Sequence, residues 1–228
     1  MRQIILDTET TGLDPKMGHK IIEIGGVEII DKIRTGNFFH FYINPERNVP
    51  DDAFKIHGIS TQFLKDKPKF REIANDFVSF IGNDDLIIHN AAFDLKFINH
   101  ELESINLKPI ISNKIIDTLL LARKKFPGSP ASLNALCKRF NIDLNQRNAS
   151  GHGALLDSEL LYKVYICLQE GLQSELLLAS AVATSKVNKV TKEKLEKKFI
   201  ADRNFEYNED FELHKEFIRG MNKSLWDA

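Results

Sequence analysis

The sequence predicts an α/β protein in which helices flank a mixed sheet. Short apolar strand patterns dominate the first part of the chain, which indicates antiparallel pairing. Farther along, short apolar strands alternate with helical patterns, which indicates helices packed on the faces of the same sheet. The 228 residues suffice for one good-sized domain with an appendage, or for two small domains.

The first part of the chain is expected to form a three-stranded antiparallel meander. Its strands are Arg2 to Asp7, Lys20 to Ile30, and Asn37 to Ile43. The loops between them are short, which favours pairing of neighbours. In the third strand, alternation places Phe39, Phe41 and Ile43 on one face.

The second part combines short strands with helices. The expected strands are Leu86 to Ile88 and Ile115 to Ile116; the expected helices are Lys69 to Ile81, Ala92 to Ile105, Leu119 to Lys125, Ser132 to Phe140, and Ala154 to Leu168. Ser132 is the expected N-cap of its helix. Polar connectors are expected over Asn44 to Asp52 and over Asn141 to Gly151.

Composition excludes several classes of protein. The formal net charge of -1 argues against a protein that coats nucleic acid by bulk charge, but leaves room for local binding of a strand end. No apolar run is long enough to span a bilayer, and the N-terminus has no signal-peptide pattern. Cys137 and Cys167 lie in apolar helical patterns typical of reduced core residues. We therefore expect a cytoplasmic protein without a membrane partner.

Asp7 and Glu9 end the first strand one residue apart. Side chains at i and i+2 share a face of a strand, so these carboxylates project together while Thr8 points away. Two ionised carboxylates this close repel unless a cation or a proton lies between them. For such a pair by itself, a solvated strand end is the simpler explanation, so a metal site requires further acids.

Two further acids and a histidine are placed to join this pair. Asp94 lies near the start of a helix that follows a short strand, and Asp157 lies early in the last helix. His152 precedes Asp157 by five residues, about 500° of rotation on one helix, which would turn the side chains apart. Gly151 and Gly153 indicate instead a loop before the helix. A histidine there suits a general base, although a loop histidine without function is the simpler explanation of this residue alone.

Four carboxylates and a histidine suit hydrolysis of a phosphodiester. Two divalent cations about 3.5–4 Å apart hold the attacking and leaving oxygens of an in-line phosphoryl displacement. Asp7, Glu9, Asp94 and Asp157 would be their metal ligands, since Mg²⁺ and Mn²⁺ prefer oxygen. His152 would take the proton of the attacking water.

The same residues carry a family resemblance. DTETTG, HNAAFD and HGALLD, in this order and spacing, resemble the three motifs of the DEDDh 3′→5′ exonucleases. The stretches AFKIHGI, ARKKFPGSPASLNALCKRF and GHGALLDSELLYKVY resemble the proofreading subunits of bacterial replicative DNA polymerases, over about residues 1–173. The resemblance implies a ribonuclease H-like fold, removal of mispaired nucleotides from a DNA 3′ end, and catalytic roles for Asp7, Glu9, Asp94, His152 and Asp157.

The resemblance also implies substrate contacts, at Asp7, Glu9, Asp52, His57 and Asp157. Asp52 stands where the best-known relatives have a glutamate, so its contact would use a shorter side chain. Without the resemblance, His57 is best interpreted as a helix-end histidine packed on Phe54.

Several neighbours compete for roles at the site. His89 is expected to form hydrogen bonds at a strand end, and Asn90 is a further candidate. Asp117 is expected to cap a helix or to support the site from outside. Phe93 and Phe97 are expected in the core by their spacing, with stacking on a terminal base as the lesser alternative.

The tail is expected to bind partners. We expect a nuclease domain over residues 1–172, a clamp-contacting segment and linker over 173–203, and a polymerase-binding tail over 204–228. Gln173, Leu176 and Leu178 resemble a sliding-clamp peptide, although the frayed end of the last helix explains them equally well. Spaced aromatic residues among acids in residues 204–226 would bind the catalytic alpha subunit of the polymerase.

Two other functions fit parts of this pattern. A stand-alone exonuclease of the same family would act on RNA ends or oligoribonucleotides, but it would not need the aromatic tail. A catalytically inert polymerase-binding module would not need four converging acids.

Overall fold

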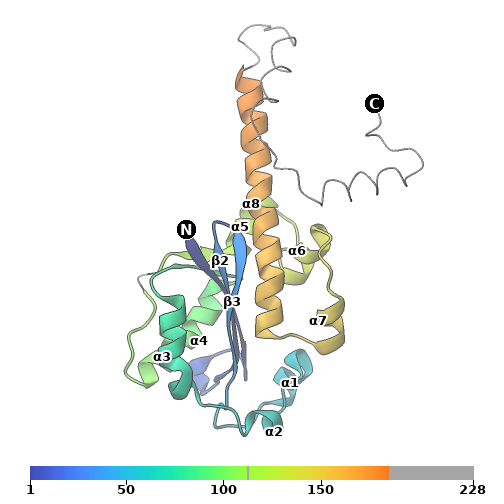
Figure 1. Ribbon diagram of the computed structural model, residues 1–228. Helices are drawn as coiled ribbons and strands as arrows, with labels where there is room; N and C mark the ends of the chain where they lie inside the picture. Colours follow the sequence, from blue (N-terminus) through green and yellow to red (C-terminus); the bar gives the residue numbers. More distant parts are fainter. Residues whose placement is uncertain (112, 185–228) are drawn as a thin grey trace, which may run out of the picture. The chain divides into compact units, whose positions relative to one another are not determined.

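The computed structural model shows a five-stranded mixed sheet (Figure 1), and it describes residues 1–111 and 113–184, without the side chains of 148–150 and 170–184. Strands β1 to β5 span Arg2–Thr10, Ile21–Ile30, Ile33–Tyr42, Asp85–Ile88 and Ile115–Asp117. Their order in the sheet is β3-β2-β1-β4-β5. β1, β2 and β3 pair antiparallel, whereas β1, β4 and β5 pair parallel. The predicted mixed sheet and meander are confirmed.

Helices cover both faces of the sheet (Figure 1). On one face lie α3 (Phe70–Ile81) and α4 (Ala91–Ser104); on the other lie α5 (Thr118–Lys125), α6 (Leu133–Arg139) and α8 (Ala154–Thr184). Cys137 is fully buried beneath the second group, as expected, and Cys167 is half-buried. No helix in the described part of the chain combines the length and the apolar character needed to cross a membrane.

β1 divides the interior into two cores because its alternate residues point to opposite faces. Ile4 and Leu6 pack with α3 and α4, whereas Ile5 packs with α5, α6 and α8. Both faces are buried, which explains why this strand is a continuous apolar run. Continued to the end of the strand, the alternation directs Asp7 toward the α8 face and Thr8 toward the α4 face.

The start of α8 rests directly on β2 at a glycine. Gly25 pairs with Asp7 in the β1–β2 register. A Cβ atom at Gly25 would lie 2.3 Å from the backbone carbon of Ala154 and 2.3 Å from the backbone nitrogen of Leu155. In addition, the Ser158 hydroxyl donates a hydrogen bond of 2.9 Å to the Gly25 carbonyl. The absence of a side chain therefore brings the first turn of α8 beside the end of β1.

Several predicted boundaries differ from the structure. β1 continues past Asp7 to Thr10, so Glu9 lies within the strand. β3 begins at Ile33 instead of Asn37, because Asp31 and Lys32 form a two-residue hairpin with φ values of +49° and +70°. That turn conformation favours Asn-Gly, Asp-Gly or Gly-Gly, so Asp-Lys does not indicate a hairpin. The last helix continues past Leu168 to Thr184, so residues 173–178 lie within α8.

Short helices occupy segments that were expected to be irregular. The predicted loop over residues 141–151 contains α7 (Asn145–Ser150), and α1 (Asp51–His57) and α2 (Thr61–Leu64) follow the polar connector. A 3-10 turn, η1 (Pro15–Met17), follows β1. Four to seven residues are too few to display helical periodicity. Their ends are fixed instead by local contacts, such as the left-handed Gly58 after α1 and the Ser60 cap of α2.

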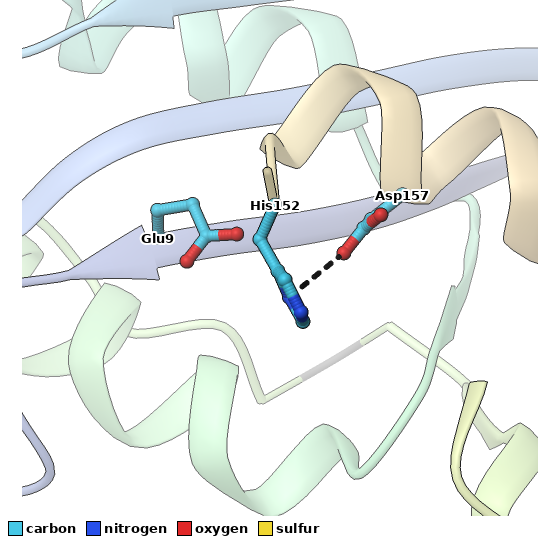
Figure 2. Close-up of side chains that lie close together, drawn as sticks. All are labelled: Glu9, His152 and Asp157. Carbon is cyan, nitrogen blue, oxygen red and sulfur yellow. Dashed lines mark ion pairs between the residues drawn. The ribbon is translucent and has the colours of Figure 1, made fainter. Parts of the chain in front are cut away.

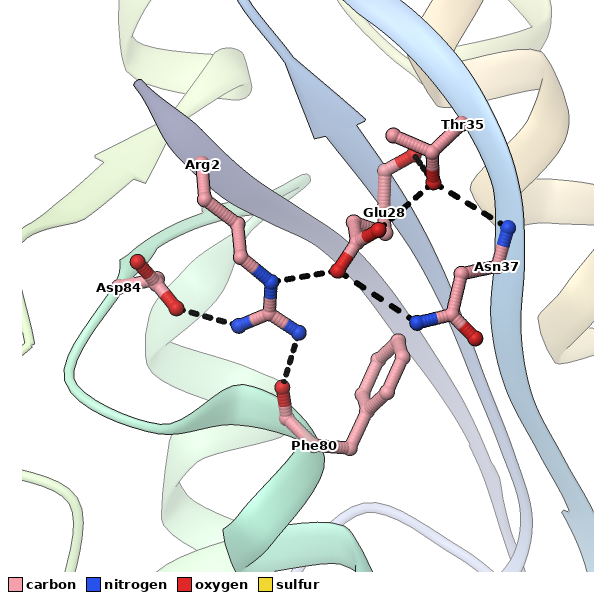
Figure 3. Close-up of polar contacts among 6 residues, drawn as sticks. All are labelled: Arg2, Glu28, Thr35, Asn37, Phe80 and Asp84. Carbon is pink, nitrogen blue, oxygen red and sulfur yellow. Dashed lines mark hydrogen bonds and ion pairs between the residues drawn. The ribbon is translucent and has the colours of Figure 1, made fainter.

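A polar network fixes the end of the sheet that is opposite the Asp7 end of β1 (Figure 3). Its members are Arg2, Glu28, Thr35, Asn37, Phe80 and Asp84. Arg2 donates to the carboxylates of Glu28 and Asp84 and, at 2.7 Å, to the Phe80 carbonyl. Glu28 also accepts a 2.7 Å bond from the Thr35 hydroxyl. Hydrogen bonds to Arg2 and Thr35 lower the pKa of the Glu28 carboxyl. The network joins β1, β2, β3 and the loop after α3.

We expect Glu28→Ala to lower the free energy of unfolding by about 2 kcal/mol, because it leaves a partly buried guanidinium without its main partner. Urea denaturation at pH 7 measures the change. Glu159→Ala is the matched control, because it removes the ion pair with Arg34, which is more exposed to solvent. It should lower the free energy of unfolding by less than about 1 kcal/mol. Equal losses in the two variants would contradict a stabilising role for the network.

Candidate active site

Four acids converge on one cavity. Asp7 and Glu9 lie near the end of β1, where the pairing with β2 shifts register after Glu9. Asp94 lies in the first turn of α4 and Asp157 in the first turn of α8. Together with His152, these acids line a cavity of about 290 Å³. Three segments that are far apart in the sequence thus contribute acids to one place.

Asp94 reaches the cavity from the opposite face of the sheet, and Thr8 holds it there. The backbone N–H and the hydroxyl of Thr8 donate to Asp94 Oδ1 at 3.1 Å and 2.7 Å. These bonds fix the orientation of the Asp94 carboxylate, which lines the cavity. Sequence reasoning treated Thr8 only as a spacer between two acids, but it also orients a third acid.

His152 lies on the loop before α8, as predicted. Its flanking Gly151 has a φ of +82°, which favours glycine. Figure 2 shows the side chains of Glu9, His152 and Asp157 gathered at the start of α8. One potential ligand atom from each of these three lies within 4.8 Å of the other two. His152 Nδ1 is 3.5 Å from Asp157 Oδ2, and the His152 side chain is 39% exposed, so it has access to water.

The acids disfavour one another's charge. Burial raises the pKa of Asp7 well above its usual range, and the neighbouring Asp94 and Glu9 charges raise it further. Burial is also the main reason why the pKa of Glu9 rises to about 8 and that of Asp94 to about 7. The pKa of Asp157 is raised for the same reason. A cation bound among these groups would relieve the repulsion.

Arg147 is a residue of the site that sequence reasoning missed. Its guanidinium donates 2.6 Å to Asp157 Oδ2 and 2.8 Å to His152 Nδ1. Burial and the Arg147 charge lower the pKa of His152. In the sequence, Arg147 lies in a polar stretch that was interpreted as a loop, and nothing there marks it as buried.

Glu23 is a second residue that sequence reasoning missed. It lies opposite Glu9 in the β1–β2 register and is 2% exposed. Its Oε1 lies 2.7 Å from His40 Nε2. The available signal was a single glutamate within the apolar run of β2, where only a partnered carboxylate is expected to be buried.

The predicted substrate residues Asp52 and His57 line a second cavity of about 570 Å³. Glu9, Thr8 and Phe93 line both cavities, so the two adjoin. The Asp52 side chain is 97% exposed at the start of α1. His57 is buried at the end of α1, and its Nδ1 accepts a 3.0 Å bond from the Ile59 N–H.

The competing residues have mainly structural contacts. His89 Nδ1 lies 2.9 Å from the Thr118 hydroxyl, although His89 also lines the first cavity. Asp117 caps α5 by accepting from the Leu119 N–H at 2.8 Å, and it also accepts from the backbone of Asn90 and Ala91 at the start of α4. The expected capping role of Asp117 is therefore confirmed. Of the two phenylalanines, Phe97 is fully buried, whereas Phe93 is half-buried and faces both cavities.

The donor set fits a divalent cation. Carboxylate oxygens are the ligands that Mg²⁺ and Mn²⁺ prefer. Asp157 Oδ1 is buried and has no hydrogen-bond partner among the described residues. A buried oxygen of this kind normally has a partner, and a cation would supply one.

Comparison with known proteins agrees with this arrangement. The family model described as Exonuclease matches residues 4–165. A DNA polymerase III subunit epsilon of Rickettsia felis is 48% identical over 98% of this chain and 98% of its own length. This chain belongs to the DNA polymerase III epsilon subunits. As a member of this exonuclease family, it is a 3′–5′ exonuclease.

Solved structures support the same fold for this epsilon subunit. Exonuclease X, in complex with 5′ overhanging duplex DNA, is 27% identical with a TM-score of 0.59, and the match covers 74% of this chain and 92% of that one. The zinc ion bound form of an Escherichia coli exonuclease I–ssDNA complex is 17% identical with a TM-score of 0.61, over 73% and 40%. At that identity it shows the fold alone. The ribonuclease H-like fold is therefore confirmed.

The raised pKa of Glu9 predicts a stability that depends on pH. Folded Glu9 keeps its proton up to about pH 8, whereas an ordinary glutamate loses it near 4.5, so stability falls as the pH rises between these values. In EDTA, Glu9→Gln should flatten this fall by at least about 1 kcal/mol in urea denaturation. Glu103→Gln, a change at an exposed residue, should leave the slope as it is. Parallel curves for wild type and Glu9→Gln would contradict the raised pKa of Glu9.

Proposed function

We propose that this chain removes mispaired nucleotides from DNA 3′ ends during replication in the cytoplasm. The observation that carries the proposal is the convergence of four acids and a histidine on one cavity. Nothing in the packing requires like charges to meet there, and their repulsion costs stability. The similarity to a DNA polymerase III subunit and to exonuclease X, which was solved with duplex DNA, supports DNA as the substrate.

Asp7, Glu9, Asp94 and Asp157 would hold two divalent cations, Mg²⁺ or Mn²⁺. When bound, such cations polarise the phosphate and stabilise charge on the attacking and leaving oxygens. The chain itself supplies oxygen ligands in fixed positions, because Thr8 orients Asp94. The buried Asp157 Oδ1, which has no hydrogen-bond partner among the described residues, supports the use of a divalent cation.

His152 would act as the general base. It would accept the proton of a water that attacks phosphorus while the bond to the 3′ oxygen of the next nucleotide breaks. The products are a nucleoside 5′-monophosphate and a strand with a new 3′ hydroxyl. Its partial exposure and its glycine-flanked loop give the ring access to that water.

The second cavity would bind the terminal nucleotide. Its lining is mostly apolar, and Phe93 lies where the two cavities meet. An aromatic ring there could stack on the terminal base. His57 and the exposed Asp52 would contact the nucleotide from α1.

We expect Asp7→Ala and Asp157→Ala each to reduce release of a mispaired 3′ nucleotide by at least about 10³-fold, because each removes a cation ligand. The assay uses full-length protein with paired DNA, mispaired DNA and RNA ends, with and without EDTA. Asp31→Ala, an exposed acid remote from the cavity, is the matched control. Undiminished activity in both site variants would contradict the assignment, and preference for RNA ends would favour the oligoribonuclease alternative.

His152→Ala should lose about 10²–10⁴-fold in rate but keep its cation affinity, because a general base is not a ligand. Calorimetric titration with Mn²⁺ measures that affinity. A loss equal to that of Asp157→Ala would instead make His152 a cation ligand.

The C-terminal part of the chain would bind the polymerase and its clamp. Residues 185–228 lie outside the described residues, as do the side chains of Gln173, Leu176 and Leu178. We assign residues 204–228 to the catalytic alpha subunit and residues 173–178 to the sliding clamp, from the sequence pattern. Similarity to the Rickettsia felis subunit over 98% of both chains supports a shared partner for the tail.

Deletion of residues 204–228 should abolish co-purification with the alpha subunit while leaving exonuclease activity on free DNA within about twofold, because the site residues all precede residue 158. An internal deletion of five residues from 186–203 serves as the control and should retain binding. Retention of the alpha subunit without residues 204–228 would place the contact elsewhere.

A further inference from the structure

Arg147 is fixed by partners from three different segments. It is 7% exposed, and its Nη1 donates to Oδ1 of Asn134 in α6. Its Nη2 donates to Asp157 Oδ2 at 2.6 Å and to His152 Nδ1 at 2.8 Å. The planar guanidinium suits such a set of contacts, whereas a flexible lysine does not. The position of the Arg147 side chain in the site is therefore fixed by specific contacts.

Arg147 also supplies positive charge to an acidic cavity. Among the described residues that line this cavity, it is the one lysine or arginine, whereas Asp7, Glu9, Asp94 and Asp157 are acids. Its ion pair with Asp157 is buried on both sides, at 6% and 4% side-chain exposure. A guanidinium at this carboxylate repels any divalent cation that approaches the same group.

The contact with His152 has a chemical consequence. An arginine N–H can only donate, so Nδ1 of His152 is the acceptor, and a neutral ring then carries its proton on Nε2. In this arrangement neither ring nitrogen is free to accept a proton from water. His152 becomes available as a base only when its hydrogen bond to Arg147 breaks.

We propose that Arg147 is a positioning residue that serves as an internal cation, occupying Asp157 and restraining His152 until divalent cations and substrate load the site. The inference rests on the proposed cation-dependent function. Arg147 keeps the cation affinity of the substrate-free protein low, and its displacement from Asp157 releases the His152 ring in the same movement. Binding of cations and availability of the base are thereby coupled.

Calorimetric titration of the full chain with Mn²⁺, without DNA, tests this role. Arg147→Gln should bind Mn²⁺ roughly tenfold more tightly than wild type, because the competing charge is gone. Arg147→Lys keeps the charge and should stay within about threefold of wild type. A residue that merely supported the fold would weaken Mn²⁺ binding when replaced, so the direction of the change is decisive.

The imidazole ¹⁵N resonances of His152, assigned with His152→Ala, provide a second measurement. In the cation-free wild type they should report a ring protonated on Nε2 whose Nδ1 accepts a hydrogen bond. Addition of Mg²⁺ to the wild type and the change Arg147→Gln should each shift the Nδ1 resonance in the same direction. If Arg147→Gln does not fold by circular dichroism, Asn134→Ala, which removes the anchor and keeps the charge, should produce that shift without Mg²⁺.

Unchanged or weaker Mn²⁺ binding by folded Arg147→Gln would overturn the inference, as would an Nδ1 resonance that responds to neither Mg²⁺ nor the variants. A wild type that binds no Mn²⁺, or that binds it equally well after Asp157→Asn, would contradict the proposed function itself. The two failures are therefore distinguishable.

Discussion

The close contact between the first turn of α8 and Gly25 is the constraint on which the site depends. Gly25 is the β2 partner of Asp7, so a helix that touches it places Asp157 beside the end of β1. The Ser158 hydrogen bond to the Gly25 carbonyl fixes the rotation of the helix. Any side chain at Gly25 would meet helix backbone, which cannot yield as a flexible side chain can. Packing on the sheet thus brings together Asp7 and Asp157, which are far apart in the sequence.

The second important feature is that four acidic side chains lie close together in one cavity. Asp94 and Asp157 come from opposite faces of the sheet, yet they line one cavity with Asp7, and burial there is the main reason why the pKa of each carboxyl is raised. The fold tolerates the repulsion because Thr8 donates to Asp94 and Arg147 donates to Asp157. Groups whose pKa values are shifted by burial and by neighbouring charges commonly cluster at active sites. Packing elsewhere, in the two cores on either side of β1, offsets the cost.

The sequence was sufficient to predict the sheet, its main helices and the converging acids, because these depend on local patterns. Period-two alternation at the end of β1 placed Asp7 and Glu9 on one face, and the glycines around His152 indicated a loop. Arg147 and Glu23 could not be predicted, since their burial results from contacts between segments distant in sequence. The hairpin before β3 was missed because its turn uses Asp-Lys, and α1, α2 and α7 were missed because they are too short to show a period.

Asp7 and Glu9 are far from Asp157 in the sequence, and this separation has a consequence for the newly made chain. Asp7 and Glu9 are synthesised first, and Asp157 follows Glu9 by 148 residues (157 − 9). At bacterial rates of roughly 5–20 residues per second, the first acids wait between roughly 7 and 30 seconds for their partner. During translation, β1 and β2 can pair before Asp157 has been added to the chain. The cavity lined by the four acids is therefore complete only once the first turn of α8 has docked on the sheet.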